Sequence, residues 1–495
     1  MPLILSGNVA SATADAGYTV ANSCRFNSAD SAYLKRTQGT PTSDQIGTIS
    51  FWFKRSSLGD SVLYNNYVSG VPQEEFCYLD FRNDDELRFA CDDPGTFNRT
   101  TQDRYFRDQS AWMHFVGTID TTQGAEADRV KLYINGEQIT STWREATMPS
   151  QNDTINLFTA SAADGNRIGV HYNGSGYYNY FNGYMSEFVY CDGQAYAASS
   201  FGEFDEDSPT IWKPKDVSGL TFGDEGFYLS FSDSADLGAD SSGNSNDFTA
   251  VNLAAADQAT DTPTNNFATL NPVDAHTTSP TFAEGNLDFH APSGTAFTPS
   301  RATIAVSKGK WYVEFKATTA SATLGACSTQ SPMDDHMRDS SDVRSIYRLT
   351  GGYWYGQNNG GAIDDQGDNS ETFTDDDICM CALDMDNGYF YFGINGTWVN
   401  GQDGSTTGDP AGNNGGSGGA GNPSSQLLTN QHDGVYTFFA MDGSTAGTGQ
   451  LQANFGNPPY TISSGNADAD GYGNFEYAPP SGFYALCTKN LAEYG

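Results

Sequence analysis

Hard oxygen ligands crowd the stretch "DMDNGYFYFGINGTW", which could therefore be a calcium loop. A helix–loop–helix calcium site takes oxygen ligands at its first, third and fifth positions, a glycine at the sixth and a glutamate at the twelfth. Counted from Asp384, the third position is Asp386, but the fifth is Gly388 and the twelfth is Asn395, so the template fails twice. The two Asn-Gly pairs instead favour two-residue hairpin turns, whose central residues both adopt positive φ. We therefore expect a short strand, Tyr389–Ile394, between two turns.

A second group of oxygen-bearing side chains lies in "GADSSGNSNDFT". Asp240, Asn244, Asn246 and Asp247 could bind calcium through their side-chain oxygens. Asx residues are also typical of turns, because their side chains hydrogen-bond to the backbone two residues on. We favour the turn and keep Asp240, Asn244 and Asp247 as candidate metal ligands; no other cofactor is indicated.

Aromatic side chains gather in two polar stretches that could bind sugars. Exposed tyrosine and tryptophan rings stack on sugar rings and anchor interfaces. The competing interpretation, which we favour for both groups, is a short strand with a buried ring, Trp354 in the second group. The candidate ligand-binding residues are Tyr177, Tyr178 and Tyr180 in "NGSGYYNYFNG", and Tyr353, Trp354 and Tyr355 in the long polar stretch 328–370.

Signatures of catalysis are weak. The six histidines are dispersed without an H-x-x-x-H or H-E-x-x-H pattern, and His114 falls in an expected strand. The letters G-x-S-x-G occur at 415–419, but inside a glycine-rich stretch that lacks the strand and helix a nucleophile elbow needs. No phosphate-binding G-x-x-x-x-G-K-[ST] is present. We expect no enzymatic activity.

Composition restricts the class of protein further. The 495 residues are rich in Gly, Tyr and Phe, which suits turn-rich sheets better than helices. A net charge of −37 repels phosphate backbones and anionic lipid heads, so we expect no nucleic-acid partner. No apolar stretch is long enough to span a membrane, and "MPLILSGNVA" lacks the features of a secretory signal. Eight cysteines without a C-x-x-C pair favour free buried thiols in a chain made in a cytoplasm.

Short alternating segments dominate the first half. In "IGTISFWFKRSS", Ile49, Phe51 and Phe53 face one way and the intervening residues the other, which predicts a half-buried strand. The segments 111–120 and 128–140 alternate too, and the latter turns at an Asn-Gly hairpin in "KLYINGE". The segment 181–196 supplies a further strand. Many short strands separated by turns predict a β-sandwich or jelly roll.

The order of these segments resembles the laminin-G/concanavalin-A-like lectin family over about residues 20–235. The more specific elements are the "KLYINGE" hairpin and the "FNGYMSEFVYCDG" strand. The resemblance implies a two-sheet jelly roll that binds glycans or protein surfaces, in some members with calcium.

A glycoside hydrolase is the enzymatic alternative, because laminarinase-like enzymes share this fold and carry E-x-D-x-E on a strand. The chain has "EFDED", with Glu203, Asp205 and Asp207 at that spacing. The last position is an aspartate, and the surrounding Ser, Gly and Pro indicate a loop. A glycosidase must hold its carboxyls about 5–9 Å apart on a rigid frame. We therefore favour a solvated acidic loop over a polysaccharide depolymerase.

The second half begins after a polar connector and resembles the SPRY domain over about residues 282–458. The motifs that carry the resemblance are a "GKWYVE" strand, a segment ending in "ALD", and an aromatic strand between two Asn-Gly turns. The family usually has Gly-Asp where this chain has Asp375-Asp376-Asp377, which shifts a turn. The resemblance implies a curved β-sandwich that binds partners through loops and has no catalytic residues.

The complete arrangement, ending in "PPSGFYALCTKNL", resembles a class of tailed-phage virion proteins. This implies a fibre, spike or surface decoration, made in a host cytoplasm, with other virion proteins as partners and a homotrimer as a fitting assembly. We expect adhesion to host-surface glycans, with a purely structural decoration as the alternative. The expected divisions are an N-terminal segment (1–20), a lectin-like jelly roll (21–250), a connector (251–281), a SPRY-like sandwich (282–460) and a tail (461–495).

Overall fold

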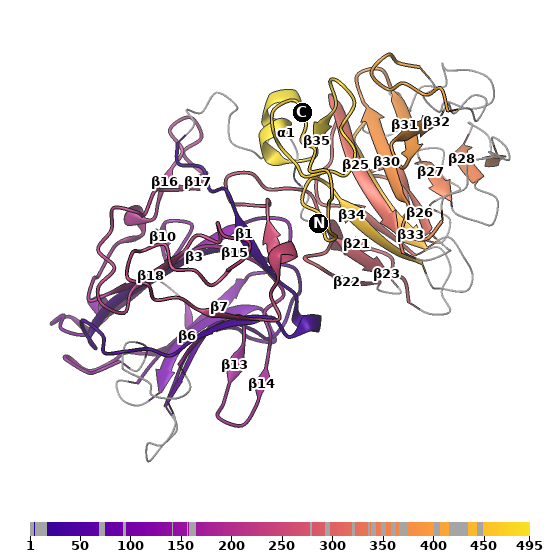
Figure 1. Ribbon diagram of the computed structural model, residues 1–495. Coiled ribbons are helices and arrows are strands. Elements are labelled where there is room, and N and C mark those ends of the chain that lie inside the picture. The colour runs from indigo at the N-terminus through magenta and orange to yellow at the C-terminus, as the bar shows by residue number, and fades with distance from the viewer. Residues whose placement is uncertain are drawn as a thin grey trace. The chain divides into compact units, whose positions relative to one another are not determined.

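The structure is a computed structural model (Figure 1). At positions 68, 75, 344–347, 353–357 and 363–365 only the backbone is described. The described residues are 4, 17–68, 75–92, 96–140, 142–155, 157, 165–277, 280–292, 298–318, 322–334, 337, 343–347, 353–357, 363–365, 374–399, 406–414, 434–442 and 449–495.

The chain divides into two compact units, Thr13–Thr264 and Asn265–Gly495 with Met1–Ala12. Within the described residues, the first unit has two eight-stranded antiparallel sheets and two small hairpins. One sheet runs β10 (Glu137–Gln138), β9 (Val130–Ile134), β8 (Met113–Asp120), β3 (Ile46–Arg55), β15 (Gly183–Asp192), β1 (Ser23–Phe26) and β20 (Gln258–Ala259), with β18 (Phe227–Leu229) beside β15. The other runs β11 (Trp143–Thr147), β7 (Phe97–Tyr105), β6 (Glu86–Asp92), β5 (Glu75–Phe81), β4 (Ser61–Val68), β12 (Asn166–Ile168), β2 (Tyr33–Arg36) and β19 (Thr249–Val251).

Aromatic side chains from both sheets form the core of the first unit. Phe51 of β3 stacks on Phe188 of β15 with ring centroids 4.6 Å apart. Phe115 of β8 meets Phe89 of the opposite sheet edge-on at 6.0 Å. Rings from facing sheets that interdigitate in this way define a β-sandwich, so the all-β prediction is confirmed for this unit.

The expectation that β3 is half-buried is wrong. Its predicted alternation is correct, because Ile49, Phe51 and Phe53 lie in the core. The opposite face is also buried, since Trp52 and Lys54 are 3% and 1% exposed. The lysine charge is compensated there by Asp261, whose Oδ2 lies 2.8 Å from Nζ, and Asp261 also accepts the indole N–H of Trp112.

The second unit is also a sandwich of two sheets. Within the described residues, one sheet is β21 (Leu270–Ala275), β24 (Pro299–Ala302), β33 (Tyr436–Asp442), β26 (Ala322–Ser328), β27 (Val343–Tyr347), β28 (Tyr353–Gln357) and β29 (Ile363–Asp365). The other is β22 (Thr281–Ala283), β23 (Asp288–His290), β34 (Gln450–Asn454), β25 (Lys310–Ala317), β30 (Ile378–Asp384), β31 (Tyr389–Ile394) and β32 (Thr397–Val399), with β35 (Tyr484–Ala485) parallel to β25. Trp311, Phe315 and Phe438 are among the fully buried residues between the sheets.

The Asn-Gly turns follow the sequence prediction in part. Asn395 and Gly396 have φ of +48° and +84° and join β31 to β32 as a two-residue turn. The turn before β31 is different, because Asp384 pairs with Tyr389 across a four-residue loop and, of the Asn-Gly pair, Gly388 alone has positive φ. Asp384 binds the backbone N–H and side-chain amide of the asparagine there and lies 2.9 Å from the Lys310 ammonium, so its carboxylate fixes the hairpin.

The cysteines of the chain fall into one disulfide pair and a set of free thiols. Cys77 and Cys91 lie opposite each other on β5 and β6 and form a disulfide, which corrects the expectation of free thiols for this pair. Six further cysteines are free and buried.

The helices of the described residues are α1 (Thr488–Tyr494) and short 3-10 turns at Ser28–Asp30, Glu126–Asp128, Ala198–Ser200 and Ala255–Asp257. No helix among the described residues has the length and apolar character needed to cross a membrane.

Candidate functional site

A polar cavity of about 630 Å³ opens on the first unit. It lies between β2, β12, the hairpin of β13 (His171–Tyr172) and β14 (Tyr177–Tyr178), and the loop that precedes β19. In Figure 1 the hairpin extends beyond the two sheets of this unit. The residues that line the cavity are Lys35, Arg36, Thr37, Arg167, Tyr172, Tyr177, Ser245, Asn246, Asp247 and Thr249.

Two cross-strand ring pairs give the hairpin its shape. Tyr172 faces Tyr177 with centroids 4.8 Å apart, and His171 stacks on Tyr178 at 4.4 Å. The turn is closed by the Asn173 side chain, which accepts two backbone N–H groups. Aromatic cross-strand pairs stabilise such two-stranded elements. The hairpin therefore presents Tyr177, which is 40% exposed, as a wall of the cavity.

The strand behind the hairpin holds the rings in place. Tyr33 of β2 stacks on Tyr177 with centroids 5.1 Å apart, and Tyr180 lies 6.3 Å from Tyr33. Of the three tyrosines proposed from the sequence as ligand-binding residues, Tyr177 lines the cavity, whereas Tyr178 turns to His171 on the other side of the hairpin. For Tyr353, Trp354 and Tyr355 the backbone forms β28, and their side chains lie outside the described part of the chain.

Three cations line the cavity, and the sequence analysis did not identify them. Arg36 forms an ion pair with Glu225 and a hydrogen bond with the Asn246 amide oxygen, so it ties β2 to the neighbouring loop. Lys35 and Arg167 occupy directly opposite positions on β2 and β12. The sequence has only 24 Lys and Arg against 61 Asp and Glu. Because cations are scarce, any cluster of them is a candidate binding site. Recognising the cluster required the pairing of these distant strands.

The candidate calcium ligands form a hydrogen-bonded turn. Asp240 accepts the backbone N–H groups of Tyr228, Ser242 and Asn246, at 2.8–2.9 Å. Asp247 in turn accepts the backbone N–H of Asp240, and the Asn244 amide donates to two carbonyl oxygens. No group of three or more His, Cys, Asp or Glu side chains suited to a metal is found among the described residues.

Of the acidic residues proposed for a hydrolase, Glu203 lies on a strand of a small hairpin, whereas Asp205 and Asp207 lie in the loop that joins its strands, as the sequence predicted. Glu203 belongs to β16 (Gly202–Phe204), which pairs with β17 (Trp212–Pro214). Asp205 is 2% exposed and accepts the backbone N–H groups that follow it. Both carboxylates face Lys213, at 3.9 and 3.4 Å. Their oxygens are therefore engaged by cations and backbone donors.

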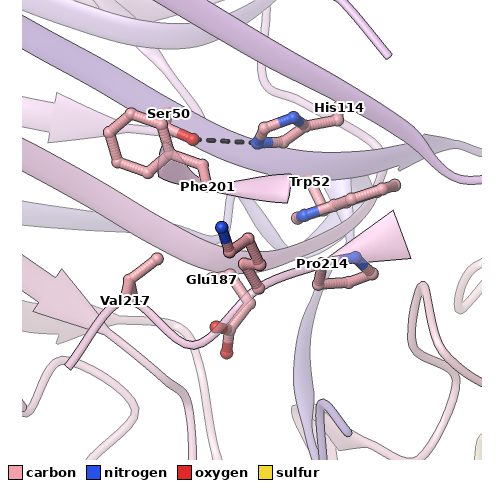
Figure 2. A pocket seen from close by; sticks show the side chains of 8 residues that line it. Ser50, Trp52, His114, Glu187, Phe201, Pro214 and Val217 are labelled. Carbon is pink, nitrogen blue, oxygen red and sulfur yellow. Dashed lines mark hydrogen bonds between the residues drawn. The ribbon is translucent and has the colours of Figure 1, made fainter. Parts of the chain in front are cut away.

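A second, tightly packed pocket contains serine, histidine and glutamate side chains (Figure 2). The Ser50 Oγ lies 2.9 Å from His114 Nε2, and the Glu187 carboxylate points away from this pair. Burial lowers the pKa of His114 to about 3 and raises the pKa of Glu187 to about 7. The pocket leaves about 0 Å³ for a water-sized sphere, so these groups form a packed polar cluster and not a ligand site.

Stacked antiparallel sheets with a loop-built cavity at one side place the first unit among the jelly-roll proteins. Residues 27–197 match the Laminin_G_3 family, described as the concanavalin A-like lectin/glucanases superfamily. The match covers about a third of the chain and gives the first unit a concanavalin A-like domain. No curated protein matches the sequence.

Solved structures resemble the chain at low sequence identity. A putative carbohydrate binding protein from Bacteroides ovatus is 17% identical and covers 47% of this chain and 58% of its own, with a TM-score of 0.31. The LG1-3 region of the laminin alpha2 chain is 11% identical over 76% of this chain and 54% of its own, with a TM-score of 0.32. The SPRY domain of human HERC1 is 13% identical over 37% of this chain and 96% of its own, with a TM-score of 0.24.

Proposed function

We propose that the protein is a carbohydrate-binding adhesin of a virion surface, and that its first unit holds a saccharide in the cavity beside Tyr177. The observation that carries the proposal is the cavity itself. Its volume of about 630 Å³ lies in the range of small-ligand sites, about 300–1,000 Å³, and it joins aromatic walls to convergent polar groups.

The chemistry of recognition follows from the lining. Tyr177 offers a partly exposed ring to the apolar face of a sugar. Ser245 and Thr249 supply hydroxyl groups that exchange hydrogen bonds with sugar hydroxyls. No catalytic step is part of the proposal. A shallow site of this kind is weak alone, and many copies on one particle would provide the avidity that adhesion requires.

Binding to glycans is tested with the whole chain on a panel of surface polysaccharides and oligosaccharides. Tyr177→Ala should weaken binding about tenfold, because a lost aromatic contact removes on the order of 1 kcal/mol. Tyr105→Ala is the matched control, since Tyr105 is 47% exposed on β7 of the same unit and does not line the cavity. Absence of any glycan binding would contradict the proposal and favour a purely structural decoration, whereas release of reducing ends would indicate a depolymerase.

The virion setting rests on the resemblance of the whole arrangement to tailed-phage virion proteins. In this proposal the chain is made in the host cytoplasm, assembles with other virion proteins, and forms a homotrimer if it belongs to a fibre. Mass spectrometry of purified particles, followed by imaging with an antibody to this chain, tests it. Particles that lack the chain would refute the virion setting and would leave the proposed binding of a saccharide in the cavity standing.

A further inference from the structure

Cations outnumber acids among the residues that line the cavity, whereas acids outnumber cations in the whole chain. The sequence has 24 Lys and Arg against 61 Asp and Glu. Among the ten residues that line the cavity, the cations are Lys35, Arg36 and Arg167, and the acid is Asp247. Because Arg36 is paired with Glu225, the excess consists of Lys35 and Arg167 against Asp247. An excess of cations at one site of so acidic a protein indicates a ligand of negative charge.

Arg167 is the most informative of these cations. It is 3% exposed, and its guanidinium carbon lies 4.1 Å from the centre of the Tyr172 ring. Its Nη1 donates to the Gly165 carbonyl oxygen at 3.0 Å, and its Nε has no hydrogen-bond partner among the described residues. No carboxylate of the described part of the chain lies within 4.0 Å of it.

The other buried cations of the described residues have the acidic partner that Arg167 lacks. Each has an aspartate within 4.0 Å, as expected because an uncompensated buried charge is costly. These pairs are Arg25–Asp257, Lys54–Asp261, Arg55–Asp85 and Arg301–Asp274. Arg167 is buried to the same degree without an acidic partner, and it borders a cavity.

Lys35 adds a second charge at the same place. It is exposed on β2, directly opposite Arg167 on β12 in the antiparallel ladder. Opposite residues have Cβ atoms about 4.5–5.5 Å apart, and like charges in such a pair repel each other. An anion bound between Lys35 and Arg167 would turn this repulsion into attraction.

We propose that the saccharide unit bound in this cavity is acidic, with its carboxylate or sulfate between Lys35 and Arg167 and its ring against Tyr177. This inference rests on the proposed function and specifies the ligand class of the same site. The aromatic wall distinguishes a sugar acid from a free inorganic anion, because a bare anion gains nothing from ring stacking. Arg167 binds an anionic oxygen by charge-assisted hydrogen bonds, which are roughly twice as strong as neutral ones.

The net charge of −37 does not prevent this binding at physiological salt. Exposed charges beyond about 8 Å are largely screened there, whereas the two cations would contact the ligand directly. At low salt the same net charge repels the ligand over longer distances, about 30 Å at 0.01 M. The association rate of an acidic oligosaccharide should therefore rise when salt is raised from low to physiological concentration.

The test is calorimetric titration of the full chain with matched oligosaccharides. The panel contains glucose, galactose and mannose oligomers of equal length, each in neutral, uronate and sulfated form. At least one acidic oligomer should bind about tenfold or more tightly than its neutral counterpart, and Lys35→Gln should remove most of that preference. Arg167→Gln should do the same, and Arg167→Lys should retain part of it. Lys308→Gln, at an exposed lysine outside the cavity, is the control.

The outcomes separate this inference from the proposed function. Tighter binding of a uronate or a sulfated oligomer supports the inference and identifies the acidic group. Equal binding of neutral and acidic oligomers overturns it while the proposed function stands. An acidic preference that survives Lys35→Gln and Arg167→Gln places the site elsewhere and overturns it too. If no oligomer binds at millimolar concentration, both proposals fail.

Discussion

The indole N–H of Trp212 donates a hydrogen bond to Nδ1 of His114 over 2.9 Å. An indole nitrogen is a donor only, so Nδ1 must be the accepting nitrogen of a neutral imidazole. The ring proton therefore resides on Nε2 and points to the Ser50 hydroxyl, 2.9 Å away. His114 cannot take a proton from Ser50 in this state, which separates the pair from an activated serine nucleophile.

We predict that His114 stays neutral, with its proton on Nε2, throughout pH 5–8. Burial lowers its pKa to about 3, far below the working range. Nitrogen-15 NMR of the imidazoles measures both the tautomer and the titration. His290 is the internal control, because the hydrogen bond with Asp288 raises its pKa and it should titrate. Titration of His114 near pH 6.5, or labelling of Ser50 by a serine-directed fluorophosphonate, would contradict this assignment.

Glu187 should make the first unit less stable as the pH rises. The residue lies at an irregularity of β15, is 5% exposed, and accepts the hydroxyls of Tyr18 and Tyr228. Burial raises its pKa from 4.5 to about 7. The folded state then binds the proton more tightly than the unfolded state, so the stabilisation is complete below about pH 4.5 and is lost as the pH rises through 7. The total effect is about 3 kcal/mol, at about 1.4 kcal/mol per pH unit.

Glu187→Gln provides the measurement of this effect. The neutral amide mimics the protonated carboxyl, so the variant should match the wild type at pH 4 and exceed its free energy of unfolding at pH 8. Urea titrations at both pH values give the difference. A variant that follows the wild-type pH profile would show that Glu187 is not the titrating group.

The alternation of apolar residues was sufficient to predict the strands but not what covers them. In β3 it correctly placed Phe51 in the core. It gave no sign that the polar face is also covered, because Asp261, the partner of Lys54, is distant in the sequence and lies in a segment without periodicity. Likewise, the letters Asn-Gly predicted the turn at Asn395, whereas the Asp384 side chain, which accepts hydrogen bonds from Asn387 three residues on, makes the other turn a four-residue loop.

Only part of the cavity could be predicted, because some of its residues come together through the pairing of distant strands. Tyr177 was a candidate because local composition alone makes it conspicuous. Lys35 and Arg167 carry no local signal, and they become neighbours only when β2 pairs with β12. A charge cluster made by strand pairing is a property of the register, which a single sequence does not give. Asp247 was a candidate metal ligand, and it lines the same cavity beside these cations.

Asp240 should stabilise the protein as a turn residue without a metal. Its carboxylate accepts three backbone N–H groups and the Ser242 hydroxyl, and removing it leaves these donors unsatisfied. We expect Asp240→Ala to cost about 2 kcal/mol of unfolding free energy, and EDTA to leave the melting temperature unchanged. Asp233→Ala is the control, because this exposed aspartate accepts the backbone N–H of Ala235 at the surface. A melting temperature that falls with EDTA and recovers with calcium would instead establish the calcium site considered from the sequence.

Glu314 connects the central strand of the second unit to the chain near the C-terminus. The side chain is fully buried in β25. It accepts the backbone N–H groups of Glu476 and Tyr477 at 3.0 and 2.7 Å, the Tyr312 hydroxyl at 2.9 Å and the Asn454 amide at 3.2 Å. The segment 461–495, expected from the sequence as a tail, is thereby held against the sheet by a carboxylate in the middle of a strand.

Glu314→Ala should therefore release the C-terminal segment and destabilise the second unit. The substitution leaves several buried donors without an acceptor, each costing about 1–3 kcal/mol, so we expect a loss of at least 3 kcal/mol in a urea titration. Limited proteolysis followed by mass spectrometry should show early cleavage within 461–495. Lys316→Ala on the same strand is the matched control: it removes a surface ion pair with Asp376, which is worth less than about 1 kcal/mol. If the two variants lose similar stability and the C-terminal segment stays protected in both, the backbone contacts of this segment hold it without the Glu314 carboxylate.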